Sequence, residues 1–220
     1  MDRIIEAYIG EYAGGKSEIS INRALELKSQ GRDVKLVDLD LVEPFYTLRP
    51  IKNQLEERGL EVIAMESRGS VGLGETGAFL RPEMKWALKN GGDVIFDVGY
   101  GVGGASALHL VEGASDEKSL RVYAVVNVAR PMTGSLEAII EFVGSLGKVD
   151  GLVNNSHLGK ETDIEILQEG AVLVSLAAKA LGIPVVVTTV AREFAGLVGA
   201  KDQMGNPVKI IDLFMQNAYW

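Results

Sequence analysis

Short apolar runs rich in β-branched residues recur along the chain. Several of them lack polar alternation, which is typical of strands that are covered on both faces. Between the runs lie segments with apolar residues at helical spacing, such as residues 17–30, a pattern that stops at Gly31. The strands predicted in this way span residues 4–9, 34–39, 61–65, 93–98, 121–127, 151–155 and 184–190.

Proline, glycine and capping residues indicate where further helices begin and end. Pro50 and Pro82 each open a helical pattern, as expected because the first turn of a helix has no use for the N–H that proline lacks. Residues 162–165 (Thr-Asp-Ile-Glu) read as a capping box for a long helix that ends near Gly182. Residues 210–220 are predicted to form a C-terminal helix that covers the sheet.

The alternation of strands and helices predicts an α/β fold. We expect a three-layer, doubly wound, mostly parallel sheet of about seven or eight strands with helices on both faces. No low-complexity linker or fixed-period repeat divides the chain, so residues 1–220 are predicted to be a single domain. Ligands of such sheets bind beyond the carboxyl ends of the strands, so functional residues are expected there.

Residues 10–17 (Gly-Glu-Tyr-Ala-Gly-Gly-Lys-Ser) match the Walker A pattern between a predicted strand and a predicted helix. The glycines let backbone N–H groups turn towards phosphate oxygens, and the helix N-terminus adds partial positive charge. Lys16 can reach the β- and γ-phosphates, while the Ser17 hydroxyl can ligate Mg²⁺. The residues predicted to bind nucleotide here are Gly10, Glu11, Tyr12, Ala13, Gly14, Gly15, Lys16, Ser17 and Glu18.

Two predicted strands end in carboxylates. Asp38 and Asp40 share one side of the second strand at its exit, and Asp97 closes an apolar strand before the glycine-rich segment 99–104. An unpaired carboxylate at the end of a buried strand is costly without a cation. Asp38 and Asp97 are therefore predicted to hold a metal ion together with Ser17. Ordinary turn or capping chemistry is the alternative for Asp38 and Asp40.

The loop at 10–17, the acidic pair at 38 and 40 and the segment 97–101 (Asp-Val-Gly-Tyr-Gly) resemble the MinD/ParA (CobQ/CobB/MinD/ParA) branch of the SIMIBI P-loop NTPases. The resemblance covers most of the chain. It implies an Mg²⁺-ATPase in which Lys16 and Asp40 are catalytic, since Asp40 lies 24 residues after Lys16 as in that branch. It also implies that Asp97 holds Mg²⁺ through water and that Gly101 senses the γ-phosphate.

By the same resemblance, an Asn at the end of a later strand closes the base pocket. Asn154 is the first choice and Asn155 the second, with a β-turn as the alternative for both. Ala191 and Arg192 fall in the segment that resembles the loop flanking adenine. The sequence contains no Asn-Lys-x-Asp guanine motif, which favours ATP over GTP.

Two residues depart from the family pattern. Glu11 stands where the branch has a Lys that reaches across a dimer, and a carboxylate there repels phosphate unless it pairs with a cation or faces away. Glu18 stands where a hydroxyl residue that contacts the α-phosphate is usual. The missing Lys leaves both a monomer and a homodimer compatible with the sequence.

Three functions fit these motifs. The first is a slow ATPase that acts as a nucleotide-dependent switch for an unidentified protein partner. The second is a kinase, in which the glycine-rich segment 72–77 covers the acceptor. The third is a nucleotide-dependent binding module with negligible hydrolysis.

Composition limits the ligands, the metal sites and the cellular location that are expected. The net charge of −8 disfavours general nucleic-acid binding, which needs a cationic surface. The absence of cysteine excludes a disulfide, a thiolate zinc site and a Cys-held iron–sulfur cluster within the chain. No apolar run reaches the length of a membrane span and no secretory signal opens the chain, so a cytoplasmic location is expected. His109 and His157 are too isolated to form a metal site.

Overall fold

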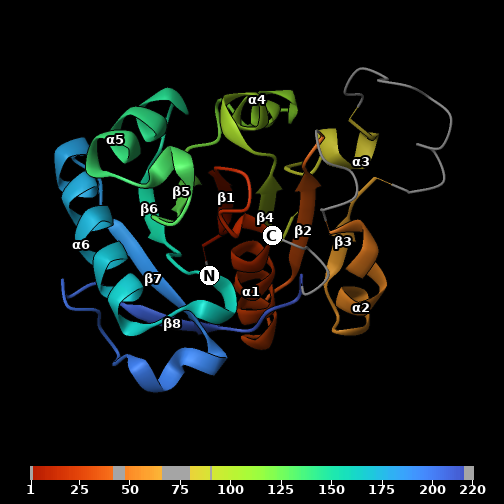
Figure 1. Cartoon of the computed structure of the whole chain (residues 1–220). Helices are drawn as coiled ribbons and strands as arrows, with labels where there is room; N and C mark the ends of the chain where they lie inside the picture. Colours follow the sequence, from red (N-terminus) through yellow and green to blue (C-terminus); the bar gives the residue numbers. More distant parts are fainter. Residues whose placement is uncertain (1, 42–47, 66–79, 90, 216–220) are drawn as a thin grey trace, which may run out of the picture.

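The computed structural model describes residues 2–41, 48–65, 80–89 and 91–215. Within these residues eight strands form one parallel sheet in the order β3-β2-β4-β1-β5-β6-β7-β8 (Figure 1). The strands are β1 (Ile5–Gly10), β2 (Val34–Leu39), β3 (Glu61–Ile63), β4 (Asp93–Val98), β5 (Leu120–Val126), β6 (Gly151–Asn154), β7 (Val185–Ala191) and β8 (Val208–Ile211).

Helices cover both faces of the sheet, as Figure 1 shows. The helices are α1 (Lys16–Ser29), α2 (Lys52–Glu57), α3 (Pro82–Lys85), α4 (Gly101–Ser106), α5 (Leu136–Ser145) and α6 (Ile164–Leu181). Short 3₁₀ turns complete the connections: η1 (Arg49–Ile51), η3 (Ala107–Leu110), η4 (Pro131–Thr133), η5 (Gly159–Glu161) and η6 (Arg192–Leu197). The predicted three-layer α/β fold is confirmed.

The central strands are buried on both faces because successive side chains point to opposite sides. In β4, Ile95 packs on the side of α1 and α2, whereas Phe96 packs on the side of the other four helices, and neither side chain is exposed. Burial of both faces explains why this strand reads as a continuous apolar run rather than an alternating one. Because helices cover both faces of the sheet, a ligand can bind at the carboxyl ends of the strands.

The C-terminal part differs from the prediction. Residues 208–211 pair with β7 as a parallel edge strand, and residues 212–215 lie against α1, so the described part of the predicted C-terminal helix is not helical. The apolar run at 210–215 suited either structure. The free edge of β7 decided between them, because it supplies partners for the backbone N–H and C=O groups of β8.

The start of α6 also differs in detail. Asp163, not Thr162, is the N-cap, and its side chain accepts a hydrogen bond from the Ile166 N–H. Thr162 instead donates to the Gly159 carbonyl in the preceding turn. The helix ends at Leu181 with Gly182 in a left-handed conformation, as the sequence predicts. The predicted acceptor loop at 72–77 lies outside the described residues.

No helix within the described residues combines the length and apolar character that a membrane crossing requires.

Candidate functional site

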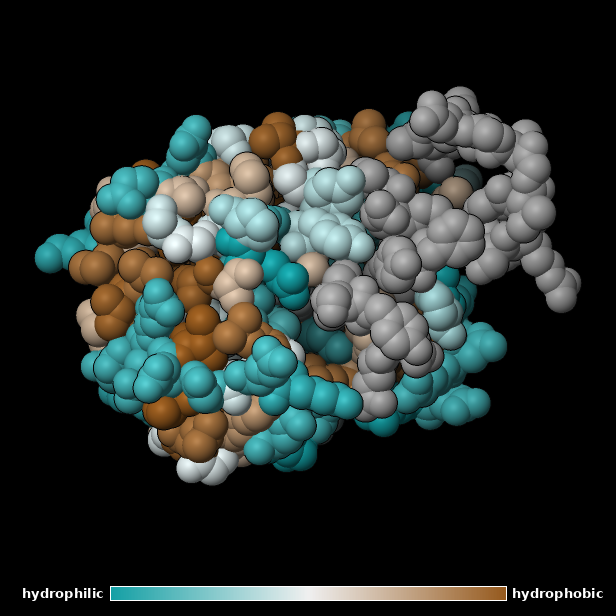
Figure 2. All heavy atoms as spheres, viewed as in Figure 1, coloured by the Kyte–Doolittle hydropathy of each residue, from teal (hydrophilic) through white to brown (hydrophobic). Residues whose placement is uncertain are grey.

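A cavity of about 480 Å³ opens at the carboxyl ends of the strands. The loop between β1 and α1 forms one end of it, and the segments that follow β6, β7 and β8 form the other. Figure 2, which has the view of Figure 1, shows apolar side chains gathered over the half of the molecule where α6, β7 and β8 lie. The lining includes Tyr12, Lys16, Ser17, Asp40 and Tyr100 at the loop end, and Ser156, His157, Thr189, Phe194, Leu213 and Met215 at the other.

The loop that joins β1 to α1 has a backbone that only glycine accommodates at two positions. Gly10 has a φ of 151°, and a Cβ there would lie 2.5 Å from the Val125 carbonyl oxygen. Gly15 has a φ of 90°, and a Cβ there would lie 2.1 Å from Nδ2 of Asn155. The left-handed turn at Gly15 brings the backbone N–H groups of the loop to the N-terminus of α1, which is the arrangement that binds phosphate.

Lys16 is folded over this loop. Its ammonium group is buried and donates to the Glu11 carbonyl oxygen at 2.9 Å. Burial lowers the pKa of Lys16, while the carboxylates of Asp97 and Asp40 act in the opposite direction. The side chain is therefore already bent towards the space that the loop encloses, with acidic groups close by.

The sheet register places two carboxylates side by side. Asp38 of β2 and Asp97 of β4 are direct partners across the two strands, and both lie on the face that α1 covers. Asp38 also lies 3.9 Å from the Arg49 guanidinium and accepts from the Asp40 N–H at 3.0 Å. Burial raises the pKa of Asp97 to about 8, and the neighbouring Asp38 adds to the shift, while the Ser17 hydroxyl and Lys16 oppose it.

Neither carboxylate oxygen of Asp97 receives a well-formed hydrogen bond from a described residue, although both are buried. A buried carboxylate of this kind is stable only with a cation or a proton. The Ser17 hydroxyl lies close enough to affect its ionisation. A hydroxyl and a carboxylate next to a phosphate loop suit a hard cation such as Mg²⁺, which keeps water and phosphate oxygens as its remaining ligands. Asp97 and Ser17 therefore fit the predicted metal site.

Asp38 fits the predicted metal site less well, because its carboxylate already contacts Arg49 and the backbone of Asp40. The described residues contain no group of three His, Cys, Asp or Glu side chains that would hold a metal by itself. Water and phosphate oxygens would complete the coordination of a cation held at Ser17 and Asp97.

Asp40 directly follows β2 and lies beside the first residue after β4. A Cβ on Gly99 would lie 3.1 Å from the Asp40 carboxylate, so the segment after β4 passes directly over this side chain. The ring of Tyr100 meets the ring of Tyr12 edge-on, with 5.5 Å between centroids. Gly101, with a φ of 66°, then begins α4. The predicted catalytic residues Lys16 and Asp40 thus line the cavity, and the predicted γ-phosphate sensor Gly101 directly follows Tyr100, which contacts the phosphate loop.

Glu11 resolves the conflict that the sequence raised. Its carboxylate is turned away from the enclosed space and accepts from the Met132 N–H at 3.0 Å. The Thr133 hydroxyl lies 3.1 Å from the same carboxylate and 2.7 Å from the Asn127 carbonyl oxygen. The carboxylate therefore ties the phosphate loop to the turn η4 instead of repelling a phosphate.

We expect Glu11→Ala to lower the free energy of unfolding by about 1–3 kcal/mol, because the Met132 N–H loses its acceptor and the buried Thr133 hydroxyl keeps only the Asn127 carbonyl. Urea unfolding measures this change. Glu11→Gln is the matched control and is expected to stay near the wild-type value, since its oxygen can accept from Met132 while its amide donates to Thr133. An equal loss in both variants would contradict the hydrogen-bonding role.

Glu18 also points away from the loop. Its carboxylate accepts from the backbone N–H groups of Phe214 and Met215, at 2.8 and 2.7 Å. Burial raises the pKa of Glu18, and these two hydrogen bonds oppose the shift. Glu18, which the sequence predicted to contribute to nucleotide binding, thus lines the cavity while its carboxylate holds the C-terminal segment.

Of the two predicted base-binding asparagines, Asn155 lines the cavity and Asn154 does not. Asn154 is buried, with its amide donating to Thr188 and its carbonyl accepting from Ser156. Asn155 donates to the Gly14 carbonyl oxygen at 2.9 Å and accepts from the Thr189 hydroxyl at 2.7 Å. Asn155 therefore braces the phosphate loop against β7, and both amides are already hydrogen bonded.

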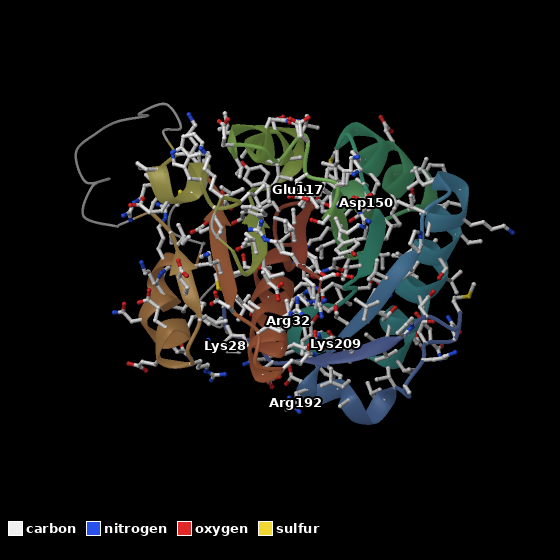
Figure 3. All side chains as sticks on the ribbon, turned by 180° about the vertical axis from the view of Figure 1, so that it is seen from behind. Lys28, Arg32, Glu117, Asp150, Arg192 and Lys209 are labelled. Carbon is white, nitrogen blue, oxygen red and sulfur yellow. The ribbon has the colours of Figure 1, made fainter. Side chains whose placement is uncertain are left out.

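Of the two residues predicted to flank the base, Ala191 and Arg192, only one lies at the cavity. Ala191 lines the cavity, but the Arg192 guanidinium is exposed and pairs with the Asp212 carboxylate at the rim of the molecule (Figure 3). Glu193 and Phe194, which follow directly, line the cavity instead. A 3₁₀ turn begins at Arg192, and it is this turn that rotates the next two side chains inward.

His157 is a cavity residue that the sequence did not mark as functional. Its Nδ1 accepts from the Gly159 N–H at 3.1 Å, and its backbone bonds to the Asn127 side chain. Burial lowers the pKa of His157 to about 4, with the nearby Arg130 adding to the shift. The imidazole is therefore neutral at pH 7. An isolated histidine in a loop carries no sequence signal that would reveal this position.

No protein-family profile and no curated protein sequence matches the chain. Solved structures do match in fold. FlhF complexed with GTP and Mg²⁺ has a TM-score of 0.54 at 13% identity, over 84% of this chain and 64% of that one. The signal recognition particle receptor FtsY from Elizabethkingia anophelis in complex with GDP has a TM-score of 0.56 at 14% identity, over 86% and 58%.

The cell division protein FtsY from Thermotoga maritima gives a TM-score of 0.52 at 14% identity, over 86% of this chain and 62% of that one. These similarities establish the P-loop NTPase α/β fold for the chain. The chain spans about three fifths of the length of those structures.

Proposed function

We propose that this protein binds a nucleoside triphosphate with Mg²⁺ and acts as a nucleotide-dependent switch with slow hydrolysis. The observation that carries the proposal is the buried, unpaired Asp97 carboxylate beside Ser17, at the end of a complete phosphate loop. Backbone N–H groups and Lys16 would hold the phosphates, while Ser17 and Asp97 would hold Mg²⁺. The cation supplies charge stabilisation at the phosphates when it is bound.

The segment after β4 supports the switch part of the proposal. It passes over the Asp40 carboxylate and contacts the phosphate loop through the Tyr12–Tyr100 ring pair. A γ-phosphate bound between Lys16 and Asp40 would press on this segment, and its loss would release it. Val102, which is 52% exposed on α4, lies where a protein partner could read that change.

Asp40 is the residue proposed to orient the attacking water, since it lies near the Lys16 ammonium without being part of the loop. The nucleotide is proposed to be ATP, because the chain lacks the Asn-Lys-x-Asp guanine motif. The bound GTP of FlhF makes GTP the direct competitor to compare.

Titration calorimetry with Mg²⁺ and either ATP or GTP tests the proposal. We expect wild type to bind, with ATP the tighter ligand, and Lys16→Ala to lose about 100-fold in affinity because one charge-assisted contact to phosphate is removed. Lys28→Ala is the matched control, since Lys28 lies at the far end of the same helix (Figure 3). Absence of binding by wild type, or equal binding by Lys16→Ala, would refute the proposal.

A second candidate is a binding module without hydrolysis. The observation in its favour is Glu11, whose engagement with η4 leaves Lys16 as the cation of the phosphate loop. Phosphate release by wild type and by Asp40→Ala separates the two: a slow rate that Asp40→Ala abolishes supports the ATPase, and equal background rates support the module. The kinase predicted from segment 72–77 gains no support from the described residues.

A further inference from the structure

The chain after β8 leaves the sheet and runs along α1 towards its N-terminus, from Asn22 to Glu18 (Figure 1). Three polar side chains of α1 face β8 and the segment that follows it; they come from positions 18, 22 and 26, which form one stripe on a helix. Glu26 pairs with Lys209 of β8, which lies beside α1 in Figure 3. Asn22 donates to the Asp212 carbonyl oxygen at 2.8 Å and accepts from the Asp212 N–H at 2.9 Å.

Glu18 is the third member of this stripe and lies closest to the phosphate loop. One carboxylate oxygen accepts from the Met215 N–H at 2.7 Å and the other accepts from the Phe214 N–H at 2.8 Å. A carboxylate that accepts two backbone N–H groups is a strong and directional anchor. The backbone of residues 212, 214 and 215 is thus held by α1, so the position of the side chains in this segment is fixed relative to that helix.

The side chains of this segment alternate, as those of an extended chain do. Phe214 packs towards the core cluster beneath α1, with the Arg58 guanidinium 5.0 Å from the centre of its ring. Leu213 and Met215 line the cavity together with Phe194 and Val190, and Met215 also packs against the same core cluster. These four side chains are apolar, whereas Lys16, Ser17 and Asp40 at the phosphate loop are polar or charged. A nucleotide has the same division between its base and its phosphates.

Glu18 directly follows Ser17, so a single peptide separates the metal-binding position from the anchor of the cavity wall. We propose that Glu18 is a positioning residue for the nucleoside half of the ligand. It holds Leu213 and Met215 at a fixed distance from the phosphate loop, so that the base and ribose pack between them and the segment after β7. The inference rests on the proposed nucleotide function and adds what fixes the base end of the same site.

Calorimetric titration with two kinds of ligand tests this role. Mg²⁺-ATP and Mg²⁺-GTP carry a nucleoside, whereas Mg²⁺-tripolyphosphate presents the phosphates alone. We expect Glu18→Ala to weaken the binding of the preferred nucleotide about tenfold, because Leu213 and Met215 are no longer held against the nucleoside. Binding of tripolyphosphate is expected to change less than about twofold. Asn22→Ala breaks the other tie to residue 212 and is expected to show the same split.

Ser29→Ala, an exposed position on the same helix, is the control and is expected to change neither affinity. Hydrogen exchange of the Phe214 and Met215 amides, measured without ligand, is expected to quicken in Glu18→Ala while the exchange of β1 amides stays slow. This measurement shows that the fold is kept and that the anchor alone is lost.

The outcomes separate the two proposals. If wild type binds nucleotide but Glu18→Ala weakens nucleotide and tripolyphosphate equally, the positioning role is overturned and nucleotide binding stands. Unchanged amide exchange at 214 and 215 in Glu18→Ala would overturn it too. If wild type binds neither ligand, the proposed function fails and the inference falls with it.

Discussion

Gly15→Ala is expected to lose nucleotide binding by about 100-fold or more and to lower the free energy of unfolding by about 2–5 kcal/mol. The added Cβ would lie 2.1 Å from Nδ2 of Asn155, and the φ of 90° strains any residue with a side chain. Asn155 cannot move away freely, because its amide holds the Gly14 carbonyl and the Thr189 hydroxyl. The loop must therefore open, which removes the N–H groups that would bind phosphate.

Gly31→Ala is the matched control, since Gly31 has a φ of 77° at the other end of α1, where an added Cβ would meet no described side chain or backbone within 4 Å. We expect it to cost about 1–2 kcal/mol for the left-handed backbone and to leave nucleotide affinity unchanged. Urea unfolding and calorimetry measure both quantities. Equal losses of stability in the two variants would show that the contact with Asn155 is unimportant.

Asp97→Asn is expected to have opposite effects on stability and on binding. Without Mg²⁺ the variant is expected to be more stable than wild type by about 2 kcal/mol, because an amide costs less to bury beside Asp38 than an unpaired carboxylate does. In the presence of Mg²⁺, the affinity of the variant for nucleotide is expected to be about 10- to 100-fold lower. The reason is that the variant lacks a carboxylate that would hold the metal ion through water.

Asp93→Asn offers the same chemical change on the same strand. Asp93 accepts from the Ile4 N–H at 2.8 Å and from the Arg32 guanidinium at 2.7 Å, so its carboxylate is fully engaged. We expect this variant to be less stable than wild type by about 2 kcal/mol, with nucleotide affinity unchanged. Thermal unfolding in EDTA compares the two variants. A loss of stability in Asp97→Asn would contradict the assignment of an unsatisfied carboxylate.

Local patterns were sufficient to predict the strands β1 to β7, the phosphate loop and the place of the carboxylates. Runs such as 93–98 are apolar because both faces of the sheet are covered, and that burial leaves its mark directly on the sequence. Gly15-Lys16-Ser17 could be recognised because phosphate binding depends on backbone conformation and on a few neighbouring residues. Asp97 could be found because a carboxylate at the end of a buried strand needs a partner.

The direction of long polar side chains could not be predicted in this way. Glu11 belongs to the phosphate loop in sequence, yet the donors that its carboxylate accepts from lie 121 and 122 residues further along, in η4. Glu18 bonds to backbone groups 196 and 197 residues away. A carboxylate takes whichever donors the fold brings within reach, and no local pattern contains that information.

The sequence by itself determined the class of the fold, the succession of its core strands along the chain and the loop that would hold phosphate, because each depends on residues close together in the chain. Only the tertiary structure decided that Glu11 braces the loop instead of opposing a phosphate, and that residues 208–215 form an edge strand and a cavity wall instead of a helix. Both outcomes depend on unpaired donors and on a free strand edge, which exist only after distant segments have come together.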